Sequence, residues 1–497
     1  MRDLSATALV AAGPAAVPIA AEGAAGQCDL VAILPRGESL RNFVYAGTLD
    51  ELAKKRSVRV FSVVPNEELR DLLRNRYGEV CDLESLDEPW TVRILRDLLD
   101  VAHGRWLWSE AAQERWRLRD FEATGLSRSL KRSAKKAICY PLANSTALEL
   151  LSRMEAAAGQ RFAATTKYTD VLARLRPALV LNTSHVHSTI AAPAIHAAKR
   201  LGLRTAAFIF SWDNLTSQGR IMPEYDYYIV WNELIRDQLL EMYSGVTPER
   251  VFVTGTPQFD FHFRPEYHWT REEFCRVVGA DPTRPIVLYC TGMANHMPGE
   301  PRIVEGIADR IRQLREFGPP QLLVRVYPKD RTGRFDELKR RRPDILIPAI
   351  PWEPAWLTPK LEDAYLLTNM LRHCAAGMNI ASTIALELCM FDKPVINIGY
   401  NPPGLSIHPL DFARYYEFDH YRPVVASGAV EVARTEEDLV RMLVAALENP
   451  RARAAQRHSL LQRFFGHSLD GKSSLRVADA IEKMIEDSEQ SPRARRG

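Results

Sequence analysis

The chain has 497 residues, of which 26% are charged and 46% hydrophobic, and its net charge is +3 from 65 basic and 62 acidic residues. This balance excludes wholesale nucleic-acid binding, and the length suggests two or three domains of ~100–200 residues each. The seven cysteines include no Cys-x-x-Cys pair, which indicates reduced thiols and argues against a disulfide scaffold or a zinc site.

Residues 5–25 are rich in Ala, Gly and Pro, within a leader that we place at residues 1–27. A signal peptide is the alternative interpretation, but Pro14 and Pro18 interrupt the apolar run, and Asp3 stands where a basic region is expected. We therefore expect a disordered leader. No apolar run in the sequence reaches the ~18 residues needed to span a bilayer, so we expect a cytoplasmic protein, either soluble or peripheral on the inner membrane face.

Short apolar runs alternate with helical stretches along the chain. In the first half they are residues 29–35, 58–64, 178–182, 205–210 and 227–231. In the second half they are residues 251–254, 285–290, 322–327, 345–347 and 395–398. Such alternation predicts parallel sheets with helices on both faces.

Two Rossmann-like domains are the simplest account of this pattern, facing across a cleft at the carboxyl ends of their strands. We place the N-terminal domain at residues 28–265 and the C-terminal domain at residues 266–455, with a polar hinge around residues 263–284. Helices are expected at residues 456–487, and a loose basic tail at residues 488–497.

Residues 379–400 are the most informative segment, because they combine a loop, a short helix and a buried strand. Ser382 is the expected N-cap, so that free backbone N–H groups would face a phosphate. Thr383 and Glu387 share one helical face, which would place a hydroxyl near a phosphate and a carboxylate near a ribose. An ordinary α/β crossover with a capped helix is the alternative.

Two other strand ends of the second half carry residues suited to a nucleotide diphosphate. Arg325 and Lys329 supply cations after one strand, and a solvated loop is the alternative there. After another strand, Gly292 allows close approach of the backbone to a phosphate, and His296 is a candidate partner or acid. Asp-x-Asp, the usual magnesium clamp, is absent from the sequence, so we expect neither a metal nor a cofactor.

Two strand ends of the first half carry candidates for the acceptor side. His185 and His187 follow one strand, and Asp213 lies in a Trp-Asp-Asn cluster after another. Any of the three could serve as a base toward an acceptor hydroxyl, and a capped loop with a buried anchor is the alternative for each.

Residues 105–136 contain nine Lys or Arg against four acidic residues, interleaved with Trp106, Trp108 and Trp116. Basic residues mixed with Trp suit an anionic membrane surface. A solvated helical face with core aromatics is the alternative, and RNA binding is a weaker third interpretation.

Residues 466–473 match the P-loop pattern G-x-x-x-x-G-K-S. A working P-loop follows a buried strand, whereas this one follows a polar helical run and leaves no room for a further sheet. We therefore reject it as a nucleotide site.

Several of these sequence segments occur in the order seen in GT-B glycosyltransferases. Within that group they most resemble the CDP-glycerol glycerophosphotransferase-like and Kdo-transferase-like members. The matching segments are residues 253–260, 286–289, 325–330, 379–400 and 470–476. Tyr327 and Asn379 depart from the glycerophosphotransferase pattern, which has His and Asp there. The resemblance implies the GT-B fold, with C-terminal helices packing back on the first domain.

The resemblance implies a metal-independent glycosyltransferase of polysaccharide or cell-envelope biosynthesis. It would move a sugar, or a polyol phosphate, from a nucleotide-sugar or CDP-activated donor to a surface glycan or a lipid-linked acceptor. A UDP-N-acetylglucosamine 2-epimerase-like enzyme and a non-catalytic scaffold of polysaccharide assembly are the alternatives.

Overall fold

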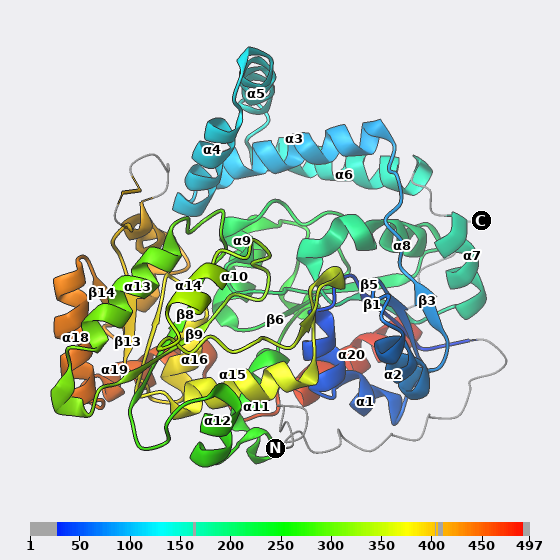
Figure 1. The fold of residues 1–497 in the computed structure, drawn as a ribbon. Helices are drawn as coiled ribbons and strands as arrows, with labels where there is room; N and C mark the ends of the chain where they lie inside the picture. The colour runs from blue at the N-terminus through cyan, green and yellow to red at the C-terminus, as the bar shows by residue number, and fades with distance from the viewer. Residues whose placement is uncertain (1–26, 163–165, 403, 406–410, 491–497) are drawn as a thin grey trace. The chain divides into compact units, whose positions relative to one another are not determined.

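The computed structural model describes residues 27–162, 166–402, 404–405 and 411–490 (Figure 1). The chain divides into two compact units. Within the described residues, unit 1 contains Phe261–Trp352 and Lys360–His467, and unit 2 contains the chain up to Asp260, Glu353–Pro359 and the chain from Ser468. The leader expected at residues 1–27 lies, except for Gln27, outside the described residues, as do residues 491–497 of the expected tail.

Unit 2 is built on a parallel sheet with the strand order β3-β2-β1-β4-β5-β6-β7 among the described residues. The strands are β1 (Leu30–Leu34), β2 (Val58–Ser62), β3 (Val80–Asp82), β4 (Leu179–Asn182), β5 (Arg204–Phe208), β6 (Tyr227–Val230) and β7 (Val251–Val253). The order reverses between β1 and β4, which is the switch point of a doubly wound fold. All five residues of β1 are buried, because helices cover both faces of the sheet.

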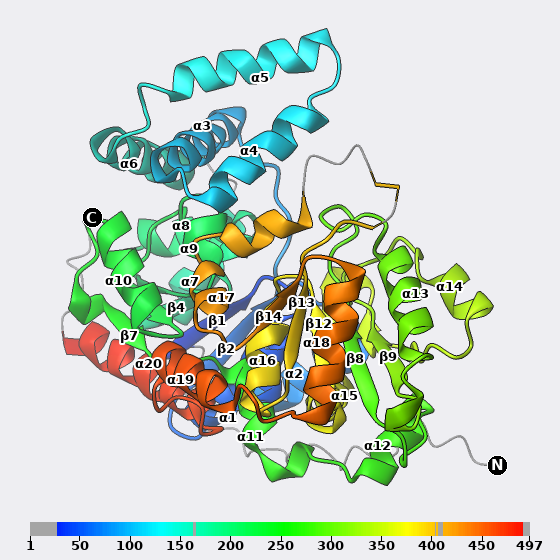
Figure 2. The same cartoon turned by 90° about the vertical axis from the view of Figure 1, so that its left-hand side faces the viewer.

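The helices of unit 2 fall into those that pack on the sheet and those that form a further layer. The first group is α1 (Thr48–Ala53), α2 (Glu67–Tyr77), α7 (Thr166–Leu175), α8 (Ser188–Arg200), α10 (Glu233–Met242) and α20 (Ser473–Gln490), and the short helix α9 (Asn214–Ser217) contacts α10. The second group is α3 (Trp90–Leu107), α4 (Glu110–Glu122), α5 (Leu126–Cys139) and α6 (Ser145–Phe162). Figure 2 shows the second group as a layer beyond α8 and α9.

This helical layer has its own small core, in which Leu99, Trp116, Cys139 and Leu148 are buried together. Trp106 packs against the same core. The prediction of aromatic residues at a membrane surface is therefore wrong for Trp116, which stabilises the packing of α3, α4 and α5 instead.

Unit 1 is built on a second parallel sheet with the order β14-β13-β12-β8-β9 among the described residues. Its strands are β8 (Ile286–Cys290), β9 (Gln321–Arg325), β12 (Ala376–Asn379), β13 (Val395–Ile398) and β14 (Glu431–Ala433). Its helices are α11 (Asp260–Phe263), α12 (Arg271–Val278), α13 (Glu300–Ile311), α14 (Asp336–Arg341), α15 (Leu361–His373), α16 (Ile384–Met390), α17 (Arg422–Ala426), α18 (Glu436–Glu448) and α19 (Ala454–Phe465).

One expected strand of unit 1 does not form. Residues 345–347 make only an isolated bridge, in which Leu346 pairs with Leu323 of β9. Pro343 and Pro348 flank this run, and a proline lacks the N–H group that a sheet ladder requires. The run is apolar enough for a strand, but the two prolines prevent the ladder of hydrogen bonds from extending.

The chain returns from unit 1 to unit 2 at Ser468, between α19 and α20. Helices were expected to cross back from residue 456, but α19 belongs to unit 1 and only α20 belongs to unit 2. The apolar face of α20, which includes Val477, Ile481 and Met484, is buried. Arg56 adds an ion pair with Glu482 at 2.8 Å.

Asp260 anchors the N-terminus of α20. Its carboxylate accepts hydrogen bonds from the backbone N–H groups of Ser473, at 2.9 Å, and Ser474, at 2.8 Å. Gly255 permits this close approach, since a Cβ on it would lie 2.5 Å from the Ser473 hydroxyl oxygen. The P-loop-like run 466–473 thus joins two helices, and the amides at its end are occupied by a protein carboxylate.

Within the described part of the chain, no helix combines the length and hydropathy needed to cross a bilayer.

Replacing Asp260 by Ala is expected to lower the free energy of unfolding by about 1–3 kcal/mol, because two buried N–H groups lose their acceptor. It should also speed proteolytic cleavage beyond His467. Chemical denaturation and limited proteolysis measure the two effects. Asp479→Ala, on the exposed face of α20, is the matched control; equal stability of the two variants would contradict the anchoring role.

Candidate functional site

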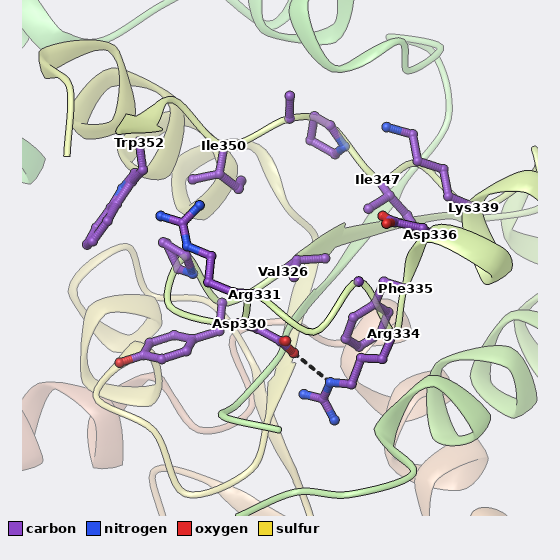
Figure 3. A pocket seen from close by; sticks show the side chains of 15 residues that line it. Val326, Asp330, Arg331, Arg334, Phe335, Asp336, Lys339, Ile347, Ile350 and Trp352 are labelled. Atoms are coloured by element: carbon purple, nitrogen blue, oxygen red, sulfur yellow. Dashed lines mark hydrogen bonds and ion pairs between the residues drawn. The ribbon is translucent and has the colours of Figure 1, made fainter. Parts of the chain in front are cut away.

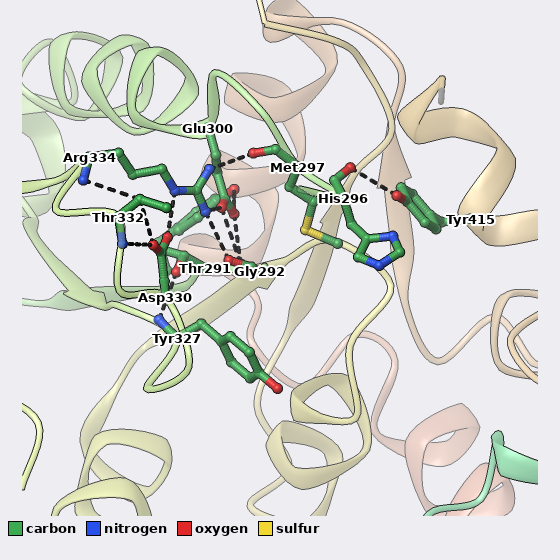
Figure 4. Close-up of polar contacts among 11 residues, drawn as sticks. Thr291, Gly292, His296, Met297, Glu300, Tyr327, Asp330, Thr332, Arg334 and Tyr415 are labelled. Atoms are coloured by element: carbon green, nitrogen blue, oxygen red, sulfur yellow. Dashed lines mark hydrogen bonds and ion pairs between the residues drawn. The ribbon is translucent and has the colours of Figure 1, made fainter. Parts of the chain in front are cut away.

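Arg334 organises the loops that follow β8 and β9 in unit 1 (Figure 4). Its guanidinium donates to the Asp330 carboxylate at 2.6 Å, to the Glu300 carboxylate at 2.8 Å and to the Gly292 carbonyl at 2.8 Å. A fourth bond reaches the carbonyl of Met297. One side chain therefore fixes both loops at the carboxyl edge of the sheet, where ligands bind in open α/β folds.

Glu300 is fully buried at the centre of this network. Its carboxylate accepts hydrogen bonds from the Gly292 amide at 3.1 Å and from the Tyr289 hydroxyl at 3.0 Å. Burial raises the pKa of Glu300 to about 7, although the Arg334 charge acts in the opposite direction.

The structure gives Gly292 a role different from the expected one. Its amide already donates to Glu300, and a Cβ on it would lie 1.9 Å from the sulfur of Met297. The absence of a side chain is thus required by packing inside unit 1, and the amide is not free to bind a phosphate.

A pocket of about 310 Å³ lies on the segment that follows β9 (Figure 3). Tyr327 and Trp352 contribute aromatic rings, and Arg331 and Lys339 contribute positive charge. Figure 3 shows Trp352 and Arg331 toward one end of the pocket and Lys339 toward the other. The volume lies at the lower end of the range for ligand sites.

The pocket and the Arg334 network share Asp330 and Arg334 as walls. Hydrogen bonds from Thr332 and Arg334 lower the pKa of Asp330, although burial alone would raise it. The loop that lines the pocket is therefore held by a charged network rather than by apolar packing alone. Sequence reasoning missed both Glu300 and Arg334, because neither adjoins a strand end in the sequence.

Arg325, expected to face a phosphate, is 6% exposed and pairs with Asp363 of α15. Its Nη2 lies 2.7 Å and 3.0 Å from the two carboxylate oxygens, and the Trp352 indole donates to the same carboxylate at 2.6 Å. Nη1 has no hydrogen-bond partner among the described residues. Arg325 is therefore paired inside unit 1, and its contact with a phosphate stays a prediction.

The start of α16 differs by one residue from the expected one. Thr383 is the N-cap, and its side chain makes no capping bond. Ser382 precedes it; its amide donates to the Asn379 side chain at 3.0 Å, and its hydroxyl lies 3.4 Å from the Ile384 nitrogen. A phosphate contact by Ser382 or Thr383 at the start of this seven-residue helix stays a prediction.

Glu387 points into unit 1 instead of away from it. It is 8% exposed, and its carboxylate lies 2.9 Å from Nε2 of His262, whose Nδ1 lies 3.0 Å from the Thr368 hydroxyl. This chain of polar groups connects α11, α15 and α16. A ribose contact by Glu387 stays a prediction, and the pair with His262 is its observed role.

His296 and Lys329 lie on the loops that Arg334 organises. The backbone carbonyl of His296 accepts a hydrogen bond from the Tyr415 hydroxyl at 2.9 Å. The ammonium group of Lys329 lies 6.0 Å from the centre of the Tyr327 ring. Both side chains are half-buried, and their assignment to a donor stays a prediction.

The acceptor-side candidates lie in unit 2, after β4 and β5. His185 is buried, with Nδ1 3.3 Å from the Phe210 nitrogen and 3.4 Å from the Phe208 carbonyl. Burial lowers the pKa of His185 to about 4, and the nearby Asp213 charge offsets this only in part. His185 is thus neutral at pH 7 but a weak proton acceptor.

Asp213 precedes α9, and its two carboxylate oxygens accept hydrogen bonds from the Ser211 hydroxyl at 2.5 Å and the Ser217 hydroxyl at 2.7 Å. Asp213 lies close enough to His185 for its charge to act on the pKa of the imidazole, and the role of either residue as a base stays a prediction. His187 belongs to the turn before α8, and its side chain is not among those that the structure describes.

Among the described residues, no group of three or more His, Cys, Asp or Glu side chains could hold a metal ion.

Comparison with known proteins shows the fold. No protein-family model and no curated protein matches the chain. Solved structures do match over nearly the whole length. A putative UDP-N-acetylglucosamine 2-epimerase from Listeria monocytogenes aligns with a TM-score of 0.54 and 14% identity, covering 93% of this chain and 97% of that one.

Two further structures give the same result. The UDP-GlcNAc 2-epimerase from Neisseria meningitidis, solved with bound UDP-GlcNAc, aligns with a TM-score of 0.53 and 12% identity over 92% of this chain and 100% of that one. The UDP-N-acetylglucosamine 2-epimerase from Rickettsia bellii aligns with a TM-score of 0.51 and 12% identity over 93% of this chain and 98% of that one. The expected GT-B-type fold, built from two Rossmann-like units, is therefore confirmed.

Arg325→Ala is expected to lower the free energy of unfolding by about 3 kcal/mol, because Asp363 keeps a buried charge without its partner. Urea denaturation followed by circular dichroism measures the change. Arg340→Ala, on the exposed surface of α14, serves as the control with the same loss of charge. Wild-type stability of Arg325→Ala would show that the ion pair contributes nothing.

The buried His185 is expected to make folding pH-dependent. Its pKa is about 4 in the folded protein and 6.5 in the unfolded chain, so protons bind preferentially to the unfolded chain between these values. Stability is therefore lost as the pH falls from about 6.5 to 4. His185→Gln should flatten the fall in thermal midpoint over this interval, whereas His458→Gln, an exposed histidine of α19, should not. If the thermal midpoints of both variants fell equally with pH, His185 would not be the source of the pH dependence.

Proposed function

We propose that the protein is an enzyme that uses a nucleotide-activated sugar and transfers its glycosyl group to a hydroxyl of a surface glycan or a lipid-linked precursor. The observation that carries the proposal is the pocket after β9, in a unit of GT-B-type fold. The neighbour from Neisseria meningitidis, solved with UDP-GlcNAc, supports a ligand of this class.

The chemistry of the pocket fits a nucleotide. The rings of Tyr327 and Trp352 offer faces for stacking, and Arg331 and Lys339 offer positive charge for phosphate oxygens. Lys339 is exposed and has no ion-pair partner among the described residues. The network around Arg334 holds these loops in place before a ligand arrives, which reduces the entropy lost on binding.

The remaining donor-side assignments belong to this proposal. Arg325 does not line the pocket, and its buried Nη1 would reach the diphosphate only if the surrounding loops moved, while Asp363 holds Nη2. Lys329, Ser382 and Thr383 would lie toward the same phosphates, and the reaction would proceed without a metal. Positive charge fixed beside the leaving phosphate would stabilise the negative charge that develops on it.

In the proposed transfer, the bond between the anomeric carbon and the phosphate oxygen breaks while the acceptor oxygen forms a bond with that carbon. The acceptor proton passes to a base, and the nucleoside diphosphate leaves. Among the three candidate bases, Asp213 is more exposed than His185, which is buried. His187 is the third candidate.

An epimerase is the second candidate, because all three of the solved structures described above carry that activity in their names. An epimerase converts one nucleotide sugar into another without an acceptor. Incubation of the protein with UDP-GlcNAc alone separates the two reactions: a new epimer indicates the second candidate, whereas release of UDP that depends on an added acceptor indicates transfer.

Binding of a nucleotide-activated sugar is tested by thermal shift with UDP-GlcNAc, other nucleotide sugars and CDP-glycerol. A ligand present at 100 times its Kd stabilises the folded state by about 2.7 kcal/mol, which raises the unfolding midpoint by several degrees. Lys339→Glu is expected to weaken binding at least tenfold, because it reverses a charge that lines the pocket.

Arg340→Glu is the matched control, since it carries the same charge change on the next residue and does not line the pocket. Equal affinity of the two variants would place the ligand elsewhere. Absence of a shift with every nucleotide-activated compound would favour a non-catalytic scaffold.

A further inference from the structure

Helix α5 exposes an apolar face. Leu126 is 87% exposed, Leu130 69% and Ile138 55%, and Ala134 between them is also exposed. These residues are spaced four apart, so they form one stripe along the helix. A soluble helix normally buries such a stripe.

The orientation of α5 is fixed by its opposite face. Cys139 is buried in the core of the helical layer, and Lys135 pairs with Asp97 of α3 at 2.8 Å. Arg132 and Lys136 both pair with Asp120 of α4. The charged side of α5 thus faces its own layer, and the apolar stripe faces away from it. Both views show α5 at the outer margin of that layer (Figures 1 and 2).

Most of the basic side chains in residues 105–136 already have an ion-pair or aromatic partner. Arg115 and Arg119 pair with Asp100, Arg117 pairs with Glu114, and Arg105 lies over the rings of Trp108 and Tyr140. With the three cations of α5 described above, seven of the nine basic residues have partners.

Arg128 and Lys131 are the other two cations, and both are exposed without a carboxylate partner among the described residues. Lys131 lies seven residues before Ile138 and therefore borders the apolar stripe. A surface that combines an apolar stripe with unneutralised cations is complementary to a partner that is apolar inside and negatively charged at its boundary.

We propose that α5 docks on the surface of an anionic lipid membrane, with Leu126, Leu130 and Ile138 entering the boundary between headgroups and acyl chains. Lys131 then lies among the anionic headgroups beside the stripe, and Arg128, in the first turn of α5, adds positive charge at that end of the helix. Helices with one apolar and one basic face bind lipid interfaces in this way. The inference goes beyond the proposed function, and it assigns the contact to the apolar stripe instead of to the tryptophans and the basic run as a whole.

Flotation of the full chain with vesicles tests the proposal. Vesicles of phosphatidylcholine with a quarter of phosphatidylglycerol should bind the protein, and pure phosphatidylcholine vesicles should bind it at least tenfold more weakly. Replacing Leu126, Leu130 and Ile138 together by Ser should weaken binding to the anionic vesicles at least tenfold. Leu150→Ser with Met154→Ser, exposed apolar residues of α6, is the control that should retain binding.

A second pair of variants tests the contribution of the two cations to membrane binding. Arg128→Glu with Lys131→Glu should reduce binding to anionic vesicles at least tenfold, whereas Arg340→Glu with Lys483→Glu, the same charge change on α14 and α20, should not. Circular dichroism confirms that each variant is folded, which is expected because all substituted side chains are exposed.

Three results would overturn the proposal. The first is that the wild-type chain fails to float with anionic vesicles. The second is that the triple Ser variant floats as well as the wild type. The third is that the chain forms a dimer in solution that the triple Ser variant abolishes while vesicle binding is absent, which would assign the stripe to a second copy of the chain.

Discussion

The hydrogen bonds of Asp260 with the first amides of α20 join two segments of unit 2 that are far apart in the sequence. Asp260 is the last residue of the long segment of unit 2, and Ser473 and Ser474 lie just after the chain has come back to that unit. The contact therefore closes unit 2 across a sequence separation of more than 200 residues, most of which belong to unit 1. Without it, α20 would be held in unit 2 by its apolar face and by the ion pair of Glu482 with Arg56.

A second constraint operates inside unit 1, where buried charges hold the loops at the carboxyl edge of the sheet. Arg334 binds Glu300 and Asp330, and Arg325 binds Asp363. Such pairs cost desolvation energy, and here their hydrogen bonds hold the loops in one arrangement. Here the fixed geometry is that of the loops around the pocket, which links the stability of the unit to its proposed function.

The strands were predictable because parallel strands buried on both faces appear as apolar runs, as in residues 29–35 and 285–290. The fold class followed from their alternation with helices. The site was harder to predict, because burial and long-range pairing decide which polar residue is available. Arg325 and Glu387 have the right chemistry at the right strand ends, yet each is paired inside unit 1. Arg334 and Glu300 lie away from any strand end, so no local pattern marked them.

The central claim is that a nucleotide-activated sugar binds in the pocket after β9. Hydrogen–deuterium exchange of the full chain with and without UDP-GlcNAc, and then with other nucleotide-activated donors, tests it most directly. The account predicts slower exchange in peptides that cover residues 326–352, with unit 2 peptides distant from the ligand unchanged. The account would be contradicted if only other segments exchanged more slowly, or if no donor slowed exchange in any peptide.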